Sequence, residues 1–229
     1  TSSGGSSTTS PDFTFNVVQD SSSQQFVAIN QVHMATQTTY GLLMRLDTTI
    51  VFPSFSGTYQ KVTALLNYDC PPEGCEPWDR VCHVMITGAN GEETELFKYI
   101  TPYAKACSDS VDVTDLVSQL QGKIRLVADF PSKSKITITL KYHEGEAPAK
   151  YSWVKKVWYN QYYSFGNFAN QQSVEEKTVA LQDTDDVYIH HAYLRIMSSG
   201  HNWGDNNTGN AAEFKEATHN IQVDGTTVY

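Results

Sequence analysis

A short, stiff loop between two apolar runs is the feature that most constrains how this chain can fold. The loop spans residues 69–80 and reads Asp-Cys-Pro-Pro-Glu-Gly-Cys-Glu-Pro-Trp-Asp-Arg. The runs on either side, 61–68 and 81–86, are rich in apolar and β-branched residues and predict strands. Prolines fix φ angles in the loop, and a bond between Cys70 and Cys75 would close a small ring. The sequence therefore predicts two strands that are joined by a rigid loop.

Short strands separated by turn signals are expected from Asp12 to Tyr142. The dipeptide Asn90-Gly91 is typical of a hairpin turn, and residues 114–121 predict a helix that Asp115 helps to cap and Gly122 ends. The expected strands are 13–18, 25–29, 40–46, 61–68, 81–87, 95–99, 110–113, 124–129 and 135–142. Strands at this regular spacing predict an all-β chain that folds as an antiparallel sandwich.

Composition and charge exclude several classes of protein. The chain has 229 residues, of which 40% are hydrophobic, so it is long enough for one large or two small domains. Its net charge of −9 argues against nucleic acid as a partner, because phosphate binding needs a basic face. No apolar run approaches the length of a membrane span. The sequence also lacks phosphate-loop and dinucleotide-binding motifs, and no cofactor is expected.

Composition also indicates how the chain is divided. Residues 1–11 are mostly Ser, Thr and Gly and predict an arm or linker. Residues 12–143 carry the regularly spaced strands and predict an N-terminal domain. The stretch 144–149 predicts a boundary, and 148–229 form a second strand-rich region. The aromatic-rich part of this region, 151–168, is typical of core packing, with carbohydrate stacking as the alternative.

The four cysteines favour an exported protein. The simplest pairing joins Cys70 to Cys75 and Cys82 to Cys107, although four cysteines allow three pairings. A zinc site is the alternative, but the spacing C-x4-C-x6-C with a distant fourth cysteine is not a usual zinc pattern. Asn206 begins an Asn-Asn-Thr glycosylation sequon, which also fits export. We therefore expect a secreted or extracellular chain with disulfides and without a metal site.

The end of the loop places an acid between a flat aromatic ring and a cation. In Trp78-Asp79-Arg80 the ring can stack on a sugar, the carboxylate can accept hydrogen bonds from hydroxyl groups, and the guanidinium can tune the charge. This arrangement predicts a carbohydrate-facing site. The alternative is structural, because Asp79 and Arg80 can form a local ion pair in a stapled turn.

Several motifs in the same order resemble those of the peptide-N-glycosidase F family. The paired cysteines followed by Trp78-Asp79-Arg80 resemble the signature loop of that family. The downstream matches are Phe97-Lys98-Tyr99-Ile100-Thr101-Pro102-Tyr103, Asp112-Val113-Thr114-Asp115-Leu116, Ala192-Tyr193-Leu194-Arg195, Ala212-Glu213-Phe214 and Thr218-His219-Asn220-Ile221. The likeness extends over residues 26–229.

The resemblance implies two jelly-roll domains side by side, the first over 12–143 and the second beginning at 148. The second domain of the family needs more chain than 148–229 supplies, so we expect this domain to be incomplete. A partner chain or self-assembly would then complete it and hold the N-terminal arm, because a half sandwich leaves strand edges open.

The family cleaves the amide that joins an N-glycan to asparagine, so the resemblance implies an N-glycosylated peptide or glycan as the substrate. It carries three acids over to this chain, Asp79, Asp129 and Glu213. Asp79 would be the catalytic acid or base, Glu213 would orient or activate the water, and Asp129 would bind a sugar hydroxyl or steady the pair. The family usually has Glu at the position of Asp129. Crowded carboxylates raise the pKa of one member, which keeps it protonated near neutral pH.

Other residues complete the expected site. Trp78, Trp203 and Phe214 are candidate stacking surfaces, and Arg80 would hold the neighbouring acids ionised. The bacterial enzyme brackets the motif around Glu213 with a disulfide, and this chain lacks the cysteines for it. Two functions therefore follow. The first is a glycoamidase that needs no metal, and the second is a non-catalytic carbohydrate-binding or structural module of an extracellular assembly.

Overall fold

The computed structural model describes residues 23–52, 58–88, 91–147, 154–159, 161, 177, 193–200, 220–223 and 226–227. The chain divides into two compact units, Thr1–Lys156 and Val157–Tyr229. Within the described residues, no helix has both the length and the apolar character that a membrane span requires. The expected strand at 13–18 lies outside the described residues.

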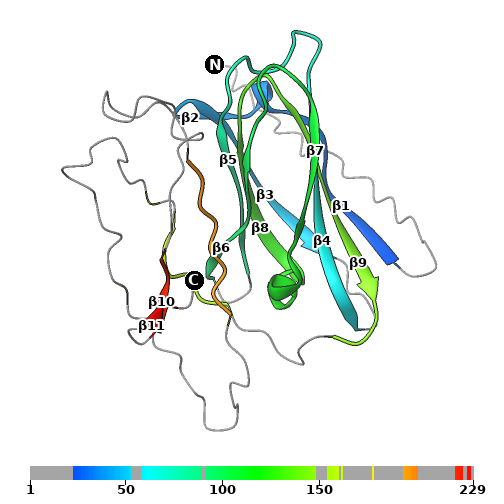
Figure 1. Ribbon diagram of the computed structural model, residues 1–229. Helices are drawn as coiled ribbons and strands as arrows, with labels where there is room; N and C mark the ends of the chain where they lie inside the picture. The colour runs from blue at the N-terminus through cyan, green and yellow to red at the C-terminus, as the bar shows by residue number, and fades with distance from the viewer. Residues whose placement is uncertain are drawn as a thin grey trace, which may run out of the picture. The chain divides into compact units, whose positions relative to one another are not determined.

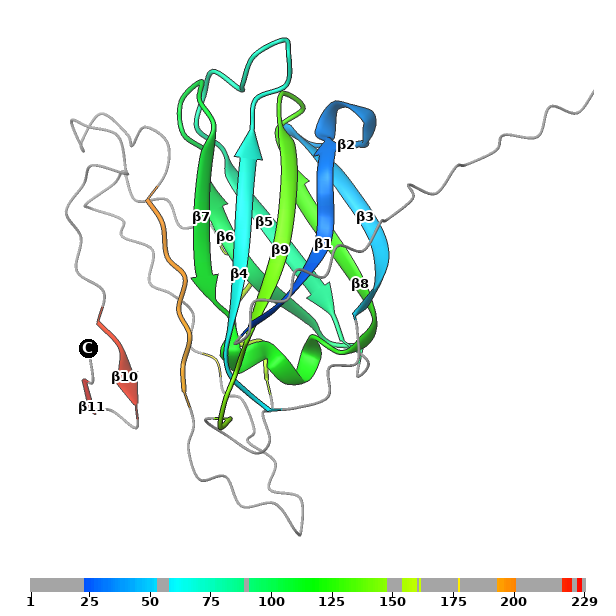
Figure 2. The same ribbon diagram turned by 90° about the vertical axis from the view of Figure 1, so that its right-hand side faces the viewer.

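The first unit contains two antiparallel sheets that face each other (Figure 1). The four-stranded sheet has the order β1 (Ser23–His33), β9 (Lys135–Glu144), β4 (Tyr59–Asp69) and β7 (Cys107–Asp112). The five-stranded sheet has the order β2 (Thr38–Tyr40), β3 (Leu43–Phe52), β8 (Gly122–Phe130), β5 (Val81–Thr87) and β6 (Glu93–Ile100). Figure 2 shows the first sheet in front of the second. This arrangement confirms the expected all-β, jelly-roll-like sandwich.

Strand alternation decides which residues form the core. Along β5, Cys82, Val84 and Ile86 are fully buried between the sheets, because successive side chains of a strand point to opposite faces. The rings of Tyr68 and Phe130 meet across the core with their centroids 6.4 Å apart. Each buried side chain of this size contributes about 1.5–3 kcal/mol through the hydrophobic effect. The core therefore holds the two sheets together and leaves one outer face on each.

The outer face of the five-stranded sheet carries polar residues that are nevertheless buried. His83 lies on this face of β5 between the inward-facing Cys82 and Val84, and it is 8% exposed. Asp129 has the corresponding place on β8 and is 3% exposed. Buried charged groups are rare unless they are paired, so this face is where a functional site is expected.

Two expectations about local structure need correction. The expected strand 40–46 is a hairpin, in which Tyr40 of β2 pairs with Leu43 of β3 and Gly41 takes the positive φ of +60° that the tight turn requires. The expected helix is a 3-10 helix, η2 (Thr114–Gln119), and its N-cap is Val113 rather than Asp115. A second 3-10 helix, η1 (Met34–Thr36), follows β1.

The second unit is described only in part. Two short antiparallel strands, β10 (Gln222–Val223) and β11 (Thr226–Thr227), form a two-stranded sheet. Four predicted site residues of this unit, Trp203, Asn206, Glu213 and Phe214, lie outside the described residues. Their roles stay predictions.

Candidate functional site

The loop between β4 and β5 is closed by the expected disulfide. Cys70 and Cys75 are bonded, and their Cα atoms lie 4.5 Å apart. Inside the ring, the backbone N–H of Gly74 donates a hydrogen bond of 2.9 Å to the carbonyl of Pro71. Gly74 has a φ of +91°, a conformation that residues with a Cβ rarely adopt. The disulfide and this turn together restrict the conformations of the loop.

Neighbouring segments hold the outside of the loop. The backbone N–H of Glu76 donates to the carbonyl of Lys133, in the β8–β9 turn, over 3.3 Å. The carbonyl of Glu76 accepts a hydrogen bond of 3.0 Å from the N–H of Ala104, between β6 and β7. His33 Nε2, at the end of β1, lies 2.9 Å from Glu73 Oε1. These connecting segments lie at one end of the sandwich, opposite η2 (Figure 2).

The Trp78-Asp79-Arg80 segment leads directly into β5. The backbone N–H of Arg80 donates to Thr101 Oγ1 over 2.9 Å, and the N–H of Thr101 donates to the carbonyl of Arg80 over 3.0 Å. These contacts extend the pairing of β5 with β6 by one residue. Because side chains alternate along an extended chain, we expect Asp79 on the same side of the sheet as Val81 and therefore on its outer face.

The side chains of this segment have different surroundings. Trp78 is 62% exposed, which leaves its ring accessible for stacking. Arg80 Nη2 lies 3.2 Å from Glu76 Oε1, so the loop supplies a carboxylate for the guanidinium. The sequence analysis named Asp79 as a possible ion-pair partner of Arg80. It did not predict the contact between Arg80 and Glu76.

Asp129 forms a bidentate ion pair with Arg45 on the neighbouring strand β3. Arg45 Nε and Nη2 donate hydrogen bonds of 2.7 Å to Oδ1 and Oδ2 of Asp129. The Arg45 guanidinium also lies over the ring of Tyr40, with the guanidinium carbon 3.4 Å from the ring centroid. The hydrogen bond with Asp129 raises the pKa of the Arg45 guanidinium above its ordinary value. The cation is therefore charged at any pH at which the protein is folded.

A second ionisable pair lies on the other side of Asp129. His83 of β5 is the register partner of Asp129, and its Nδ1 atom lies 2.7 Å from Glu95 Oε1 on β6. Both side chains are largely buried, at 9% and 15% exposure. The outer face of the five-stranded sheet thus carries a row of four side chains on four adjacent strands, Arg45, Asp129, His83 and Glu95.

Two of the three predicted acids, Asp79 and Asp129, belong to segments at the same end of the sandwich. Asp79 precedes β5, and Asp129 lies near the end of β8, where the next turn contacts the disulfide loop through Lys133. Glu213 lies outside the described residues, so its predicted place beside them is untested. The described part of the chain has no cluster of three or more His, Cys, Asp or Glu residues that could hold a metal ion.

The second predicted disulfide is wrong, because Cys82 and Cys107 are free thiols. Cys82 is buried in the core, whereas Cys107 is exposed on the edge strand β7. The two cysteines belong to different sheets, and the ring of Tyr99, the register partner of Cys82, contacts the Cys107 side chain through its hydroxyl group. Burial raises the pKa of the Cys82 thiol well above its ordinary value.

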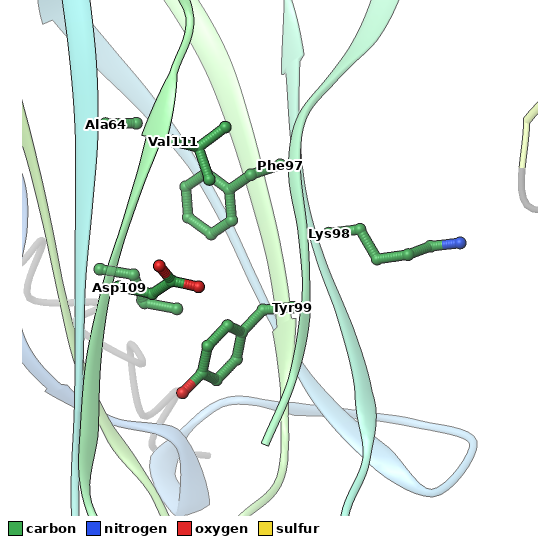
Figure 3. Close-up of a pocket in the computed structure, with 7 residues that line it drawn as sticks. Ala64, Phe97, Lys98, Tyr99, Asp109 and Val111 are labelled. Atoms are coloured by element: carbon green, nitrogen blue, oxygen red, sulfur yellow. The ribbon is translucent and has the colours of Figure 1, made fainter. Parts of the chain in front are cut away.

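A small pocket lies elsewhere, between the edge strands β6 and β7 (Figure 3). None of the predicted site residues lines it. In Figure 3 the Asp109 carboxylate and the Tyr99 ring face each other across the gap, while Lys98 points away. The lining residues are Ala64, Leu66, Phe97, Lys98, Tyr99, Asp109 and Val111. The pocket is therefore separate from the candidate site.

Comparison with known proteins finds a similarity to peptide-N-glycosidase F over part of the chain. No family model matches the chain. Peptide-N(4)-(N-acetyl-beta-D-glucosaminyl)asparagine amidase F of Elizabethkingia miricola is 30% identical over 92 residues, which make up 38% of this chain and 26% of that protein. Over these 92 residues the chain is similar to peptide-N-glycosidase F. The chain spans about a quarter of the length of this relative.

Solved structures of PNGase F-like proteins are also similar to the chain. The PNGase F glycosylasparaginase from Flavobacterium meningosepticum has a TM-score of 0.49 and 23% identity, over 56% of this chain and 44% of that chain. The structure of PNGF-II has a TM-score of 0.40 and 11% identity, over 53% of this chain and 35% of that chain.

The residues around Asp129 were not predicted from the sequence. Arg45 and Tyr40 belong to the segment 40–46, for which the sequence predicts a single strand, and His83 belongs to the strand predicted after the loop. One signal was available: β3 carries Arg45 and Asp47 two positions apart, and β8 carries Arg125 and Asp129 on a matching face. Charges with strand spacing on two segments indicate cross-strand pairs.

Proposed function

We propose that this chain hydrolyses the amide of glycosylated asparagine, with Asp79 as its catalytic acid or base. The observation that carries the proposal is that Asp79 follows a disulfide-closed loop, at the end of the sandwich where a second predicted acid, Asp129, is buried. Rigid presentation favours catalysis because reacting groups tolerate little misplacement. The named activity of the E. miricola relative supports the same reaction.

The proposed reaction needs a base for water and an acid for the leaving nitrogen. Asp79 takes a proton from water as the oxygen attacks the side-chain carbonyl of asparagine, and it returns a proton to the nitrogen as the C–N bond breaks. The products are a glycosylamine and a peptide in which asparagine has become aspartate. Glu213 would orient the water, and Asp129 would accept a hydrogen bond from the sugar.

The substrate of this proposed site is an N-glycosylated peptide. Trp78 suits sugar stacking because 62% of it is exposed at the end of the braced loop. Trp203, Phe214 and Arg80 are the further candidates for substrate contact. An extracellular location is part of the proposal, since a disulfide such as Cys70–Cys75 is typical of oxidising compartments.

A second candidate function is non-catalytic carbohydrate binding. The observation that favours it is the bidentate contact between Arg45 and Asp129, which engages both carboxylate oxygens. An acid that is committed to an ion pair can hold a ligand without taking part in proton transfer. The two functions predict different products, so one experiment separates them.

The test is mass spectrometry on an N-glycopeptide that is incubated with the protein in heavy-oxygen water. The amidase converts asparagine to aspartate with one heavy oxygen, and Asp79→Asn abolishes the conversion. Glu73→Gln is the matched control, because Glu73 is a carboxylate of the same loop that pairs with His33 and is not a site residue. If folded wild-type protein leaves the glycopeptide unchanged, the amidase proposal is wrong and carbohydrate binding becomes the leading function.

A further inference from the structure

We infer that Arg45 is the positioning residue of Asp129, an inference that rests on the proposed function of the site. Arg45 lies directly opposite Asp129 in the register of β3 and β8, two neighbouring strands in Figure 1. Its Nε and Nη2 atoms donate hydrogen bonds of 2.7 Å to different oxygens of the carboxylate. A bidentate contact fixes the plane of the carboxylate as well as its distance from the cation. Asp129 is therefore held in one orientation.

Tyr40 fixes the guanidinium in turn. The guanidinium carbon of Arg45 lies 3.4 Å from the centroid of the Tyr40 ring, within the range of a cation–π contact. The side chain of Arg45 is 29% exposed, whereas that of Asp129 is 4% exposed. The exposed Tyr40 ring thus restricts the orientation of the Arg45 guanidinium, and the guanidinium restricts the orientation of the buried Asp129 carboxylate.

A second ion pair on the same two strands provides an internal comparison. Arg125 of β8 donates hydrogen bonds of 2.9 and 2.6 Å to the carboxylate of Asp47 on β3. The side chains of this pair are 51% and 44% exposed. The two pairs share strands and bidentate geometry, and they differ in burial. Exposed pairs contribute little, and a buried pair must offset the desolvation of both charges. Burial of the Arg45–Asp129 pair is better explained by the geometry of a site than by strand pairing.

This geometry assigns a limited role to Asp129. A carboxylate has about four acceptor positions, and the contacts with Arg45 use one on each oxygen. The carboxylate can thus accept a hydrogen bond from a sugar hydroxyl or from the N–H of an N-acetyl group. Proton transfer then falls to Asp79, and Asp129 holds the sugar next to it.

The test is a double-mutant cycle on glycopeptide cleavage and on binding of N,N′-diacetylchitobiose by calorimetry. Arg45→Lys keeps the charge but loses the bidentate fork, and we expect kcat/KM to fall by about 10- to 100-fold. Arg125→Lys, the matched change at the exposed pair, should stay within about twofold of wild type. In an Asp129→Asn background, Arg45→Lys should have no further effect beyond about twofold, since Arg45 acts through Asp129.

Further readouts keep the inference testable. Tyr40→Leu leaves both charges in place and should lower kcat/KM by about two- to fivefold, again only when Asp129 is present. This variant replaces Arg45→Lys in the cycle if the latter fails to fold by thermal melting. The effect of Tyr40→Leu should be the same in an Arg125→Lys background, because the exposed Arg125–Asp47 pair is independent of the Arg45–Asp129 pair.

Each outcome decides either the inference or the function. If wild type cleaves and Arg45→Lys has the same effect with or without Asp129, the inference is overturned and the proposed function stands. If wild type binds chitobiose without cleavage, and Arg45→Lys weakens binding only when Asp129 is present, the amidase proposal fails and the inference stands. A folded wild type that neither binds nor cleaves overturns both.

Discussion

Asp129 lies opposite His83 in the register of β8 and β5, and both side chains are buried on the outer face of the five-stranded sheet. On either side, Arg45 pairs with Asp129 and Glu95 pairs with His83. Buried ionisable groups are stable when each has a partner, and here they have partners along a row that crosses four strands. The arrangement is sensitive to the removal of any one member.

Arg45→Met tests this sensitivity through stability. The substitution leaves the Asp129 carboxylate buried without its cation, and removal of one partner of a buried pair costs about 3–5 kcal/mol in free energy of unfolding. Arg125→Met removes the corresponding cation from the exposed pair with Asp47 and should cost about 1 kcal/mol or less. Urea unfolding at neutral pH measures both values. Equal losses for the two variants would show that burial of the Asp129 pair has no energetic consequence.

Cys70→Ser tests the contribution of the disulfide. The bond joins residues that are five positions apart, and opening so short a loop should lower the free energy of unfolding by roughly 2 kcal/mol. Because the loop leads to Asp79, the variant should also lose activity in the glycopeptide assay. The comparison with wild type is made by thermal melting, and a melting curve that is unchanged would contradict the expected stabilisation.

The thiols can be counted directly. Cys107 should react with iodoacetamide in the native protein because it is exposed, and Cys82 should react only after unfolding because it is buried. The disulfide-bonded pair, Cys70 and Cys75, should react only after reduction. Mass spectrometry of the alkylated chain gives the count at each stage. A chain that stays unlabelled when it is unfolded without a reductant would restore the second disulfide that the sequence predicted.

Much of the fold of the first unit could be predicted from the sequence because strands leave a local signal. The expected segment 81–87 coincides with β5, where an apolar residue alternates with an outward-facing one. The disulfide between Cys70 and Cys75 was predictable for a similar reason, since the short separation and the prolines bring the two residues together. Gly41 was the exception, because its turn divides an apolar run into two strands.

The partners within the site could not be predicted, because they depend on register between distant segments. Arg45 and Asp129 are 84 residues apart, and only the pairing of β3 with β8 places them opposite each other. The predicted disulfide between Cys82 and Cys107 was wrong for a related reason. Cysteine count alone does not reveal that one thiol faces the core while the other lies on an edge strand.

Two buried groups should make stability fall at alkaline pH. Burial raises the pKa of the Cys82 thiol well above its ordinary value and raises that of Tyr68 to about 12. In the unfolded chain the pKa of a cysteine thiol is about 8.5 and that of a tyrosine is about 10. Because the folded-state pKa values are the higher ones, the stabilisation is complete below the unfolded values. This stabilisation is lost as the pH rises toward the pKa values of the folded state.

Cys82→Ala separates the contribution of the Cys82 thiol to the pH dependence of stability from that of Tyr68. At neutral pH the variant should be less stable than wild type by about 1 kcal/mol, because it leaves a small cavity in the core. Between about pH 8.5 and 10 its free energy of unfolding should fall less steeply, by up to about 1.4 kcal/mol for each pH unit, so the difference from wild type shrinks. Cys107→Ala, which changes an exposed thiol, is the control and should follow wild type. Urea titrations across this pH range decide the matter, and parallel curves for wild type and Cys82→Ala would contradict the expected linkage.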